Sequence, residues 1–379
     1  MNKPILTLIT TSFPISGDGS EAAGAFVADF AEELAKHVRV HVVAPGSHDI
    51  QETWSDNVQI FRFIAPSKPL STLNPWRPTD AVSTFQVLRS GMRATHLAAQ
   101  GSSHILALWA LPCGAWAKRA AKELGISYSV WMLGSDVWTL GRIPVIRHVL
   151  ARVIQQAQNA YADGYLLAKD AEKIAGRPIA FLPSTRRIGM VQYPAPRSQP
   201  PYRLLFLGRW HPNKGIDLLL EALHMLTDVD WQQIEVVEIQ GGGPMQAEVK
   251  FAIDALQAQG RPVVQGRYLA KAEAEAAIAR ADWVLIPSRI ESIPVVFSDA
   301  MKMMRPVVTM PVGDLSQLLQ RQLCGVLTTK VTADAYSIAL RHAIKSSTLN
   351  YVEGVQAHAQ NFNLPLLSKN LIEEMMQNE

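Results

Sequence analysis

The sequence predicts an α/β protein with two domains, each built on a parallel sheet covered by helices. Two observations lead to this fold class. Short apolar runs alternate with amphipathic helical patterns along the whole chain, and a proline-rich break divides this alternation into two parts of similar size. With 379 residues, 48% of them hydrophobic, the chain is long and apolar enough for two or three buried cores.

The first half of the chain contains two strand-helix-strand patterns. An apolar strand, an amphipathic helix and a second strand follow one another at ILTLIT (5–10), AFVADFAEELAKH (25–37) and VRVHVVAP (38–45). The same order recurs at HILALW (104–109), AWAKRAAKELG (115–125) and SYSVWML (127–133). Such repeated units are typical of a parallel sheet with helices on its faces.

A linker is predicted at QYPAPRSQPP (192–201), because four of its ten residues are proline. The alternation restarts after it, with strands at 202–208, 233–241 and 281–288 and helices at 217–226 and about 245–258. We therefore expect an N-terminal domain at 1–190, a linker at 191–201, a C-terminal domain at 202–362 and a terminal helix at 363–379.

Composition narrows the class of protein. The first 190 residues hold 19 basic and 14 acidic side chains, and the rest hold 17 and 19, an asymmetry too weak to indicate nucleic-acid binding. Cys113 and Cys324 lie too far apart in sequence for a metal motif, and we expect neither a disulfide framework nor a metal site. This cysteine usage fits a reducing cytoplasm, which is the expected location, and no apolar run is long enough for a membrane anchor.

Ligands of parallel sheets bind at the carboxyl ends of the strands, and glycine-rich loops lie at several such ends here. GRWHPNKG (208–215) places Arg209 and Lys214 in a loop that begins at Gly208. A guanidinium and an ammonium group together suit a diphosphate. The alternative is a solvated turn with two surface cations.

QGGGP (240–244) follows another strand and contains Gly241 and Gly243. These glycines permit close approach of a backbone to a nucleotide, with Pro244 near a helix start. The stretch lacks the spacing and the acidic residue of a dinucleotide fingerprint, which disfavours a nicotinamide-dependent dehydrogenase. A plain strand-to-helix turn is the alternative.

SRIESIPVVFSDAM (288–301) places the acids Glu291 and Asp299 after a buried strand. Pro294 is expected as the first helical residue and Ser292 as the helix cap. The free amides of this helix start favour an anion, and the two acids accept hydrogen bonds from sugar hydroxyls beside it. Alternatively, Asp299 is an ordinary solvated helix acid.

These motifs, in this order and together with RPVV, resemble the donor domain of the large retaining glycosyltransferase family with the GT-B fold. That family includes phosphatidylinositol mannosyltransferases, sucrose-phosphate synthases and bacterial polysaccharide enzymes. In the first half, FPISGDGSEAAGAFVADFAEELA, ALWALPCGAWA and LGSDVW carry the resemblance as well. It implies two Rossmann-like domains facing each other across a cleft, with the C-terminal helix packing back on the N-terminal domain.

The resemblance also implies roles for individual residues. The catalytic set is Arg209 and Lys214 on the donor diphosphate and Glu291 against the donor sugar. Asp299, expected on the ribose, belongs to the donor-binding set. The donor-binding set adds Gly24, Gly208, Gly241, Gly243, Gly266, Arg267, Ile293, Pro294 and Val295. On the acceptor side lie Gly134, Ser135 and Asp136. The implied activity is retaining transfer of a hexose-like sugar from a UDP- or GDP-linked donor to a glycan or lipid-linked acceptor, with no further cofactor.

The sequence departs from the family at several positions. Asp299 is one methylene shorter than the usual glutamate, Leu133 stands where histidine is common, and Met304 stands where glycine is usual. GDG (17–19) is not the family's paired glycine, although GAF (24–26) fits a common variant. A front-face mechanism, in which the leaving diphosphate takes the acceptor proton, needs no histidine base.

The sequence leaves two alternative functions and the placement of one helix open. A sugar-nucleotide epimerase of the same fold, or a catalytically silent glycosyltransferase-like binding subunit, would share these motifs. The helical pattern at 141–157 combines an apolar stripe with Arg142, Arg147 and Arg152. Such a helix can lie peripherally on the inner face of an anionic membrane, or it can pack in the core with a solvated basic face.

Overall fold

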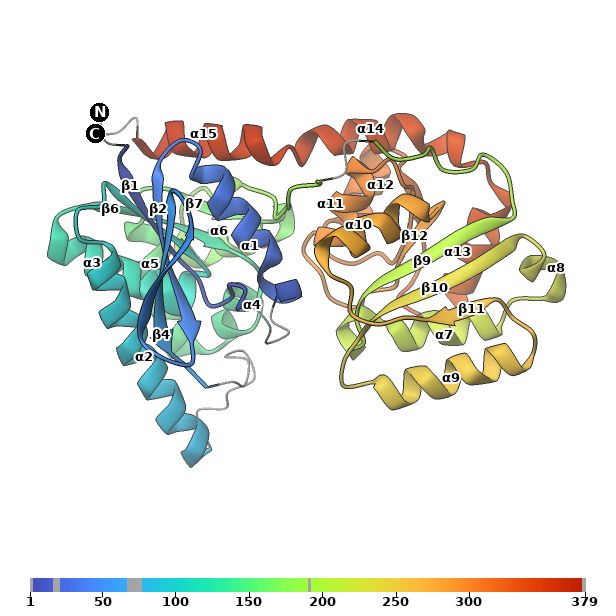
Figure 1. Ribbon diagram of the computed structural model, residues 1–379, viewed down its shortest axis with the longest axis horizontal. Helices are drawn as coiled ribbons and strands as arrows, with labels where there is room; N and C mark the ends of the chain where they lie inside the picture. The colour runs from blue at the N-terminus through green and yellow to red at the C-terminus, as the bar shows by residue number, and fades with distance from the viewer. Residues whose placement is uncertain (1–2, 16–20, 67–76, 190–191, 377–379) are drawn as a thin grey trace. The chain divides into compact units, whose positions relative to one another are not determined.

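The computed structural model describes residues 3–15, 21–66, 77–189 and 192–376. The chain forms two compact units (Figure 1). Residues 1–187 and 364–379 make up the first unit, and residues 188–363 make up the second. Each unit has its own parallel sheet and is described by itself below.

Within the described residues, the first unit contains an eight-stranded sheet in the order β3-β4-β2-β1-β5-β6-β7-β8. Its strands are β1 (Ile5–Ile9), β2 (Arg39–Gly46), β3 (Ile50–Ser55), β4 (Val58–Ile64), β5 (His104–Leu108), β6 (Ser127–Met132), β7 (Ala160–Ala162) and β8 (Ala180–Phe181). Its α-helices are α1 (Glu21–Leu34), α2 (Pro78–Ala98), α3 (Ala115–Leu124), α4 (Ser135–Trp138), α5 (Pro144–Gln156), α6 (Tyr165–Ala175) and α15 (Leu364–Met376), with short turns of helix at Ala110–Gly114 and Leu140–Arg142. All neighbouring strands are parallel except β3, which runs antiparallel to β4 at the sheet edge.

Helices cover both faces of this sheet because the strands are apolar on both sides. In β5, Ile105 and Ala107 pack toward α2, α3 and α5, whereas Leu106 and Leu108 pack toward α1 and α15. Both cores consist of buried side chains, most of them apolar. This burial on two faces explains why the strands appear in the sequence as unbroken apolar runs.

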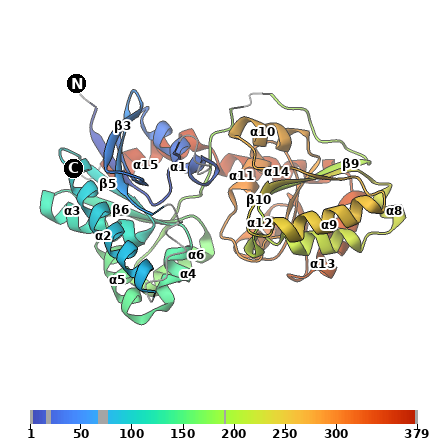
Figure 2. The same cartoon turned by 60° about the horizontal axis from the view of Figure 1, so that its bottom comes forward.

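The last helix, α15, belongs to the first unit, as predicted. It lies beside α1 on the sheet face opposite α2 and α3 (Figures 1 and 2). Leu364, Leu371, Ile372 and Met375 form one helical stripe, and all four are buried in the core that α1 also lines. Their spacing of seven, one and three residues is that of an amphipathic helix facing an apolar surface.

The second unit contains a six-stranded parallel sheet in the order β11-β10-β9-β12-β13-β14 among the described residues. Its strands are β9 (Tyr202–Arg209), β10 (Ile234–Gly242), β11 (Val263–Gln265), β12 (Trp283–Ile286), β13 (Val307–Thr309) and β14 (Gly325–Leu327). Its α-helices are α7 (Ile216–His224), α8 (Asp228–Trp231), α9 (Gln246–Ala258), α10 (Lys271–Arg280), α11 (Val295–Lys302), α12 (Leu315–Arg321), α13 (Ala333–Lys345) and α14 (Val352–Asn361), with 3₁₀ turns at Pro212–Lys214 and Thr348–Tyr351. The predicted fold class, two parallel-sheet α/β domains, is confirmed.

The helix after β1 begins earlier than predicted. The sequence predicted a helix from residue 25 with Gly24 in the preceding loop, but α1 begins at Glu21, so that Gly24 lies in its first turn. A Cβ atom on Gly24 would lie 2.6 Å from the Cδ atom of Pro14. Gly24 therefore lets the helix start pack closely against the segment that leaves β1. The GDG stretch at 17–19 lies outside the described residues.

The helix α5, at 144–156, packs in the core along its second half, as one of the two arrangements considered for it requires. Leu150, Val153 and Ile154 of α5 are buried in the core, whereas Val145 and Val149, nearer its start, are 77% and 44% exposed.

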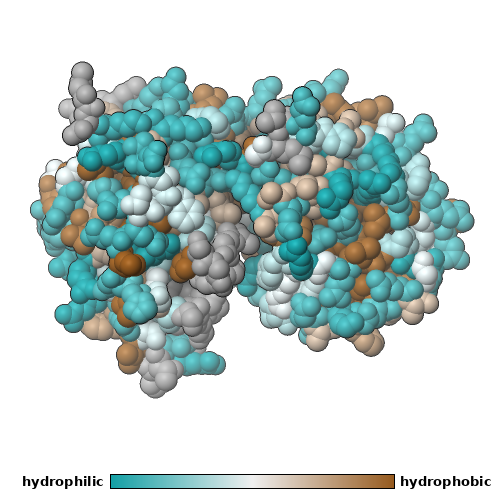
Figure 3. Space-filling model, in the orientation of Figure 1, coloured by the Kyte–Doolittle hydropathy of each residue, from teal (hydrophilic) through white to brown (hydrophobic). Residues whose placement is uncertain are grey.

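In the face shown in Figure 3 the surface is mostly hydrophilic, as expected where helices turn apolar sides inward. None of the helices in the part of the chain that is described could cross a bilayer, being too short or too polar.

Candidate functional site

Most of the predicted donor-site residues gather at the carboxyl edge of the second sheet. Strands β9 and β10 end side by side, with Gly208 paired to Gly241 and Arg209 to Gly242. Strand β12 lies on the other side of β9. The loops that follow these three strands therefore start at neighbouring points, as expected for parallel strands.

The glycines after β10 allow its loop to pack on the loop after β9. Gly241 has a φ of +144°, and a Cβ atom there would lie 1.9 Å from the carbonyl oxygen of Gly208. Gly243 has a φ of +151°, and its Cβ would lie 2.6 Å from the carbonyl oxygen of Trp210. Only glycine tolerates both the conformation and the contact. The close approach predicted for these glycines is made, in this structure, to a neighbouring backbone.

A buried tryptophan anchors the loop that carries the two cations. Trp210 is fully buried, and its backbone amide donates to the carbonyl oxygen of Gly242 at 2.8 Å. Its own carbonyl accepts from the amide of Met245 at 3.2 Å. Arg209, next to it, is exposed at the end of β9. The loop is therefore not a mobile solvated turn, because its centre is fixed in the core of the unit.

Lys214 is brought against the loop that follows β12. Its ammonium group forms an ion pair with the carboxylate of Glu291, and their side chains are 36% and 12% exposed. The hydroxyl of Ser288 donates to the same carboxylate oxygen at 3.0 Å. A phosphate-binding cation and a sugar-binding acid, inferred from motifs far apart in sequence, thus lie in direct contact. Of the two cations that the alternative placed on the surface, Arg209 is exposed, whereas Lys214 is partly buried and paired with Glu291.

The helix after Glu291 starts differently from the prediction. α11 begins at Val295, with Pro294 in the flanking N-cap position, and no side chain caps it. Ser292 is therefore not the cap; its carbonyl oxygen accepts instead from the amide of Asp314 at 3.3 Å. Ile293 and Pro294 are buried, and Val295 is half-buried. The first amides of α11 have no intrahelical acceptors, so this end of the helix remains suited to an anion.

Asp299 is buried in α11. Only 1% of the residue is exposed, and its carboxylate lies 3.4 Å from the ammonium group of Lys302, one turn further along the helix. The alternative of an ordinary solvated helix acid is therefore wrong. A buried carboxylate needs a compensating charge, and Lys302 supplies one.

The turn after β11 is held to the end of β10. Gln240, largely buried, accepts from the amide of Arg267 at 3.3 Å through its side-chain oxygen, and a Cβ on Gly266 would lie 1.8 Å from that oxygen. The guanidinium of Arg267 is exposed and makes two hydrogen bonds to Glu273, at 2.6 and 3.1 Å. Sequence reasoning missed Gln240, although a polar residue ending a buried strand before three glycines is a usable signal.

On the first unit, Gly134, Ser135 and Asp136 lie where β6 passes into α4. Gly134 has a φ of +111°, and Ser135 is exposed. Asp136 is fully buried and accepts from the amide of Ala110 at 2.8 Å, so it holds the start of the 110–114 turn and faces the interior. Burial raises the pKa of its carboxyl to about 6. Leu133 packs beside the core that α1 and α15 share.

Sequence reasoning also missed an arginine. Arg289, between Ser288 and Glu291, makes two hydrogen bonds to the carboxylate of Asp217 in the first turn of α7. In isolation such a residue looks like an ordinary loop cation, and its partner is 72 positions away in sequence.

Among the described residues, no group of three or more histidine, cysteine or acidic side chains is arranged to hold a metal ion.

Comparison with known proteins shows what the segment that contains this site is similar to. Residues 201–346 match the family model described as glycosyl transferases group 1. The alpha-D-kanosaminyltransferase of Streptomyces kanamyceticus is 27% identical over 126 residues, which are 33% of this chain and 31% of that protein. The alignment thus spans about a third of the relative's length. The resemblance noted in the sequence is confirmed for the segment that contains the candidate site.

Solved structures extend the similarity of fold to nearly the whole chain. Sucrose-phosphate synthase from Thermosynechococcus elongatus superimposes with a TM-score of 0.72 at 16% identity, covering 99% of both chains. Anabaena HepE in complex with UDP-glucose gives 0.68 at 14% identity, covering 98% of this chain and 99% of the other. At such identities the likeness is one of fold, and the fold is that of the GT-B glycosyltransferases.

Proposed function

We propose that the protein is a retaining glycosyltransferase that moves a sugar from a nucleoside-diphosphate donor to a glycan or lipid-linked acceptor. The observation that carries the proposal is the contact between Lys214 and Glu291 at the carboxyl edge of the second sheet. One of these groups suits a phosphate and the other a polyol, which are the two parts joined at the bond that breaks in such a donor.

Each residue then has a role in the reaction. Arg209, Lys214 and the first amides of α11 neutralise the diphosphate as charge develops on it. Glu291 accepts hydrogen bonds from hydroxyls of the transferred sugar, and Asp299 accepts from the ribose. In the front-face reaction, the bond between the anomeric carbon and the diphosphate oxygen breaks. The acceptor oxygen forms its bond to that carbon on the same face, and its proton passes to the diphosphate.

The similarities support parts of this proposal. The match of residues 201–346 to glycosyl transferases group 1 supports a glycosyl transfer reaction. The structure of HepE with UDP-glucose supports a sugar nucleotide as the donor, and UDP- or GDP-linked sugars are the donors that we expect. The side chain of Leu133 has no basic group, which favours the mechanism in which the leaving group accepts the proton.

The test begins with ligand binding. A thermal-shift screen against UDP-, GDP- and ADP-linked sugars should show a rise in melting temperature with one nucleotide, because a ligand that binds only the folded state stabilises it. NMR of that donor, alone and with glycan or lipid-linked acceptors, then separates the candidates. We expect slow release of a sugar with retained anomeric configuration, and faster transfer when an acceptor is present.

The other results would identify the alternatives. Conversion of the donor to an epimer without an acceptor would indicate a sugar-nucleotide epimerase and contradict the proposal. Binding of a donor with neither hydrolysis nor transfer would indicate a silent binding subunit. A product with inverted configuration would contradict the retaining mechanism while leaving the class of enzyme intact.

We also propose that the protein is cytoplasmic and that α5 makes peripheral contact with an anionic membrane surface. Ile143 and Val145 are 44% and 77% exposed, and Arg142, Arg147 and Arg152 are exposed around them. Apolar side chains within a basic rim match an anionic lipid headgroup region. Such contact would bring a lipid-linked acceptor to the enzyme.

Vesicle sedimentation tests this contact. The protein should sediment with phosphatidylglycerol vesicles and not with phosphatidylcholine vesicles, and Val145→Asp or Arg147→Glu should reduce the bound fraction. Val229→Asp is a matched control, because Val229 is 63% exposed on the second unit. Equal sedimentation of the wild type and both α5 variants would contradict the proposal.

A further inference from the structure

Arg289 joins the two loops that carry the predicted catalytic residues. It lies two residues before Glu291 in the loop after β12, and its guanidinium and its backbone amide donate hydrogen bonds to segment 212–217. Its guanidinium donates to both carboxylate oxygens of Asp217, at 2.7 and 2.6 Å, and to the carbonyl oxygen of Pro212 at 2.7 Å. Its backbone amide donates to the carbonyl oxygen of Asn213 at 2.8 Å.

These contacts lie on both sides of Lys214. Pro212 and Asn213 precede it, and Asp217 follows it in the first turn of α7. Gly215 adds a fourth point of contact, because a Cβ there would lie 1.9 Å from the carbonyl oxygen of Pro287. The segment that bears Lys214 is thus held to the loop that bears Glu291 both before the lysine, at Pro212 and Asn213, and after it, at Gly215 and Asp217.

The geometry of the Arg289–Asp217 pair suits a positioning role. A planar guanidinium with two parallel hydrogen bonds fixes orientation as well as distance, which a lysine cannot do. Burial alone would raise the pKa of Asp217, but the hydrogen bonds and charge of Arg289 hold it below its usual range. The pair is only partly buried, with side chains 32% and 40% exposed, so its value lies in geometry more than in stability.

We propose that Arg289 is a positioning residue of the donor site, which fixes the loop bearing Lys214 relative to Glu291 so that both groups contact one ligand. This inference rests on the proposed function, because it concerns the same diphosphate. Arg289 itself faces Asp217 and the 212–213 backbone. Its effect on the diphosphate is therefore transmitted through the position of Lys214.

The test is a double-mutant cycle on nucleotide affinity, with UDP, GDP and ADP as probes in calorimetry. Arg289→Gln should weaken binding of the nucleotide that the wild type binds by about 10- to 100-fold, the cost typical of a misplaced binding group. In a Lys214→Ala background the same change should have an effect of less than about twofold, because the residue through which Arg289 acts is gone. Arg289→Lys should restore only part of the affinity.

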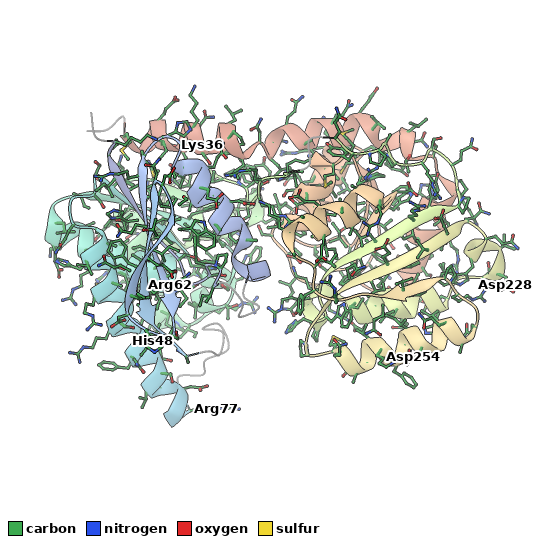
Figure 4. The ribbon with its side chains drawn as sticks, in the orientation of Figure 1. Lys36, His48, Arg62, Arg77, Asp228 and Asp254 are labelled. Carbon is green, nitrogen blue, oxygen red and sulfur yellow. The ribbon has the colours of Figure 1, made fainter. Side chains whose placement is uncertain are left out.

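A matched control separates this role from general stability. Arg261→Gln removes a hydrogen bond of 2.6 Å to Asp228, the first residue of α8, at the far end of the second unit (Figure 4). α8 precedes β10 and Arg261 precedes β11, so this pair lies at the amino ends of the strands. It should leave nucleotide affinity unchanged. If Arg289→Gln does not fold, Arg289→Lys supplies the readout.

The affinities in the two backgrounds distinguish failure of this inference from failure of the proposed function. An equal loss of affinity in the wild-type and Lys214→Ala backgrounds would mean that Arg289 acts independently of Lys214, and would overturn the inference. Unchanged affinity in Arg289→Gln would overturn it as well, while the proposed function would stand if the wild type still binds and turns over a donor. If the wild type binds none of the three nucleotides, the proposed function fails, and the inference fails with it.

Discussion

The ammonium group of Lys214 is paired with the carboxylate of Glu291, 77 positions later in the chain. Under the proposed function, a diphosphate that takes Lys214 as its counter-ion would compete with this pairing and release Glu291 toward the sugar hydroxyls. The ion pair therefore fixes the two side chains relative to each other. Its contribution to the free energy of folding is modest, because both side chains are partly exposed.

The first prediction concerns this pair. Lys214→Ala and Arg209→Ala should each lower the transfer rate by about 10²–10³-fold, since each removes a charge that stabilises the leaving diphosphate. Glu291→Gln should lower transfer as well but leave nucleoside-diphosphate affinity equal to or higher than that of the wild type, because Lys214 loses its competing partner. Steady-state kinetics and calorimetry measure the two effects. Lys250→Ala, a surface lysine paired with Asp254 on α9, is the control. Wild-type turnover in both Arg209→Ala and Lys214→Ala would show that the site is elsewhere.

The second prediction uses two glycines with the same backbone conformation. Gly215 and Gly176 both have a φ of +67°, but a Cβ on Gly215 would lie 1.9 Å from the carbonyl oxygen of Pro287, whereas nothing lies within 4 Å at Gly176. Gly176→Ala should therefore cost about 1 kcal/mol of unfolding free energy, the price of the conformation alone. Gly215→Ala should cost more and should also weaken donor binding, because the loop bearing Lys214 has to move. Urea unfolding and calorimetry of both variants provide the comparison, and equal effects would contradict the packing role of Gly215.

The third prediction concerns Met304, which stands where glycine is usual in the family. It has a φ of +62° at the end of α11, a conformation that is unfavourable for a side chain. Met304→Gly should raise the unfolding free energy by about 0.5–1 kcal/mol, since relief of this strain exceeds the entropic cost of glycine. Met303→Gly is the control: Met303 is fully buried with a φ of −97°, and its loss should destabilise the protein. A lower melting temperature in Met304→Gly would show that the side chain contributes more than its conformation costs.

The fourth prediction concerns pH. His104 is buried in β5 with its Nε2 atom 2.9 Å from the hydroxyl of Ser129, and burial lowers the pKa of the imidazole from 6.5 to about 4. Between these values the unfolded chain takes up the proton first, so stability should fall as pH drops from about 6.5 toward 4. From pH 7 to pH 5 the loss should be about 2 kcal/mol.

Urea unfolding of His104→Asn at the two pH values checks this directly. The variant should lose about 2 kcal/mol less than the wild type over that interval. The comparison must be with the wild type, because Asp136, with its pKa raised to about 6, contributes with the opposite sign between about pH 4 and 6. His48→Asn, at an exposed histidine (Figure 4), is the control substitution. An identical slope in His104→Asn and the wild type would rule out the buried histidine as its cause.

Much of the sheet topology could be predicted from the sequence, because strands buried on both faces appear as unbroken apolar runs. β1, β5, β6 and β9 begin at the predicted residue and end within one residue of the predicted end. Helix starts were harder: Glu21 begins α1 four residues before the predicted start, because contact of Gly24 with Pro14 is a tertiary effect with no local signal. The same holds for the N-cap of α11.

The residues of the candidate site also fall into those that the sequence could predict and those that it could not. Lys214 and Glu291 could be proposed from motif chemistry, since charge and glycine content near strand ends are visible in sequence. The partners that orient them could not. Arg289 lies in the loop after β12 and Asp217 lies in the first turn of α7, and the pairing of β9 with β12 brings these two segments together. Likewise the burial of Asp299 depends on how α11 packs, which its spacing from Glu291 does not reveal.

The position of α15 has a consequence for biosynthesis. The first unit needs Leu371, Ile372 and Met375 to complete the core that α1 also lines, yet the ribosome makes these residues after the entire second unit. The second unit, which is contiguous in sequence, can fold while translation continues. The first must wait with an apolar groove uncovered until the last turns of helix emerge, so nascent chains stalled before that point should depend on chaperones.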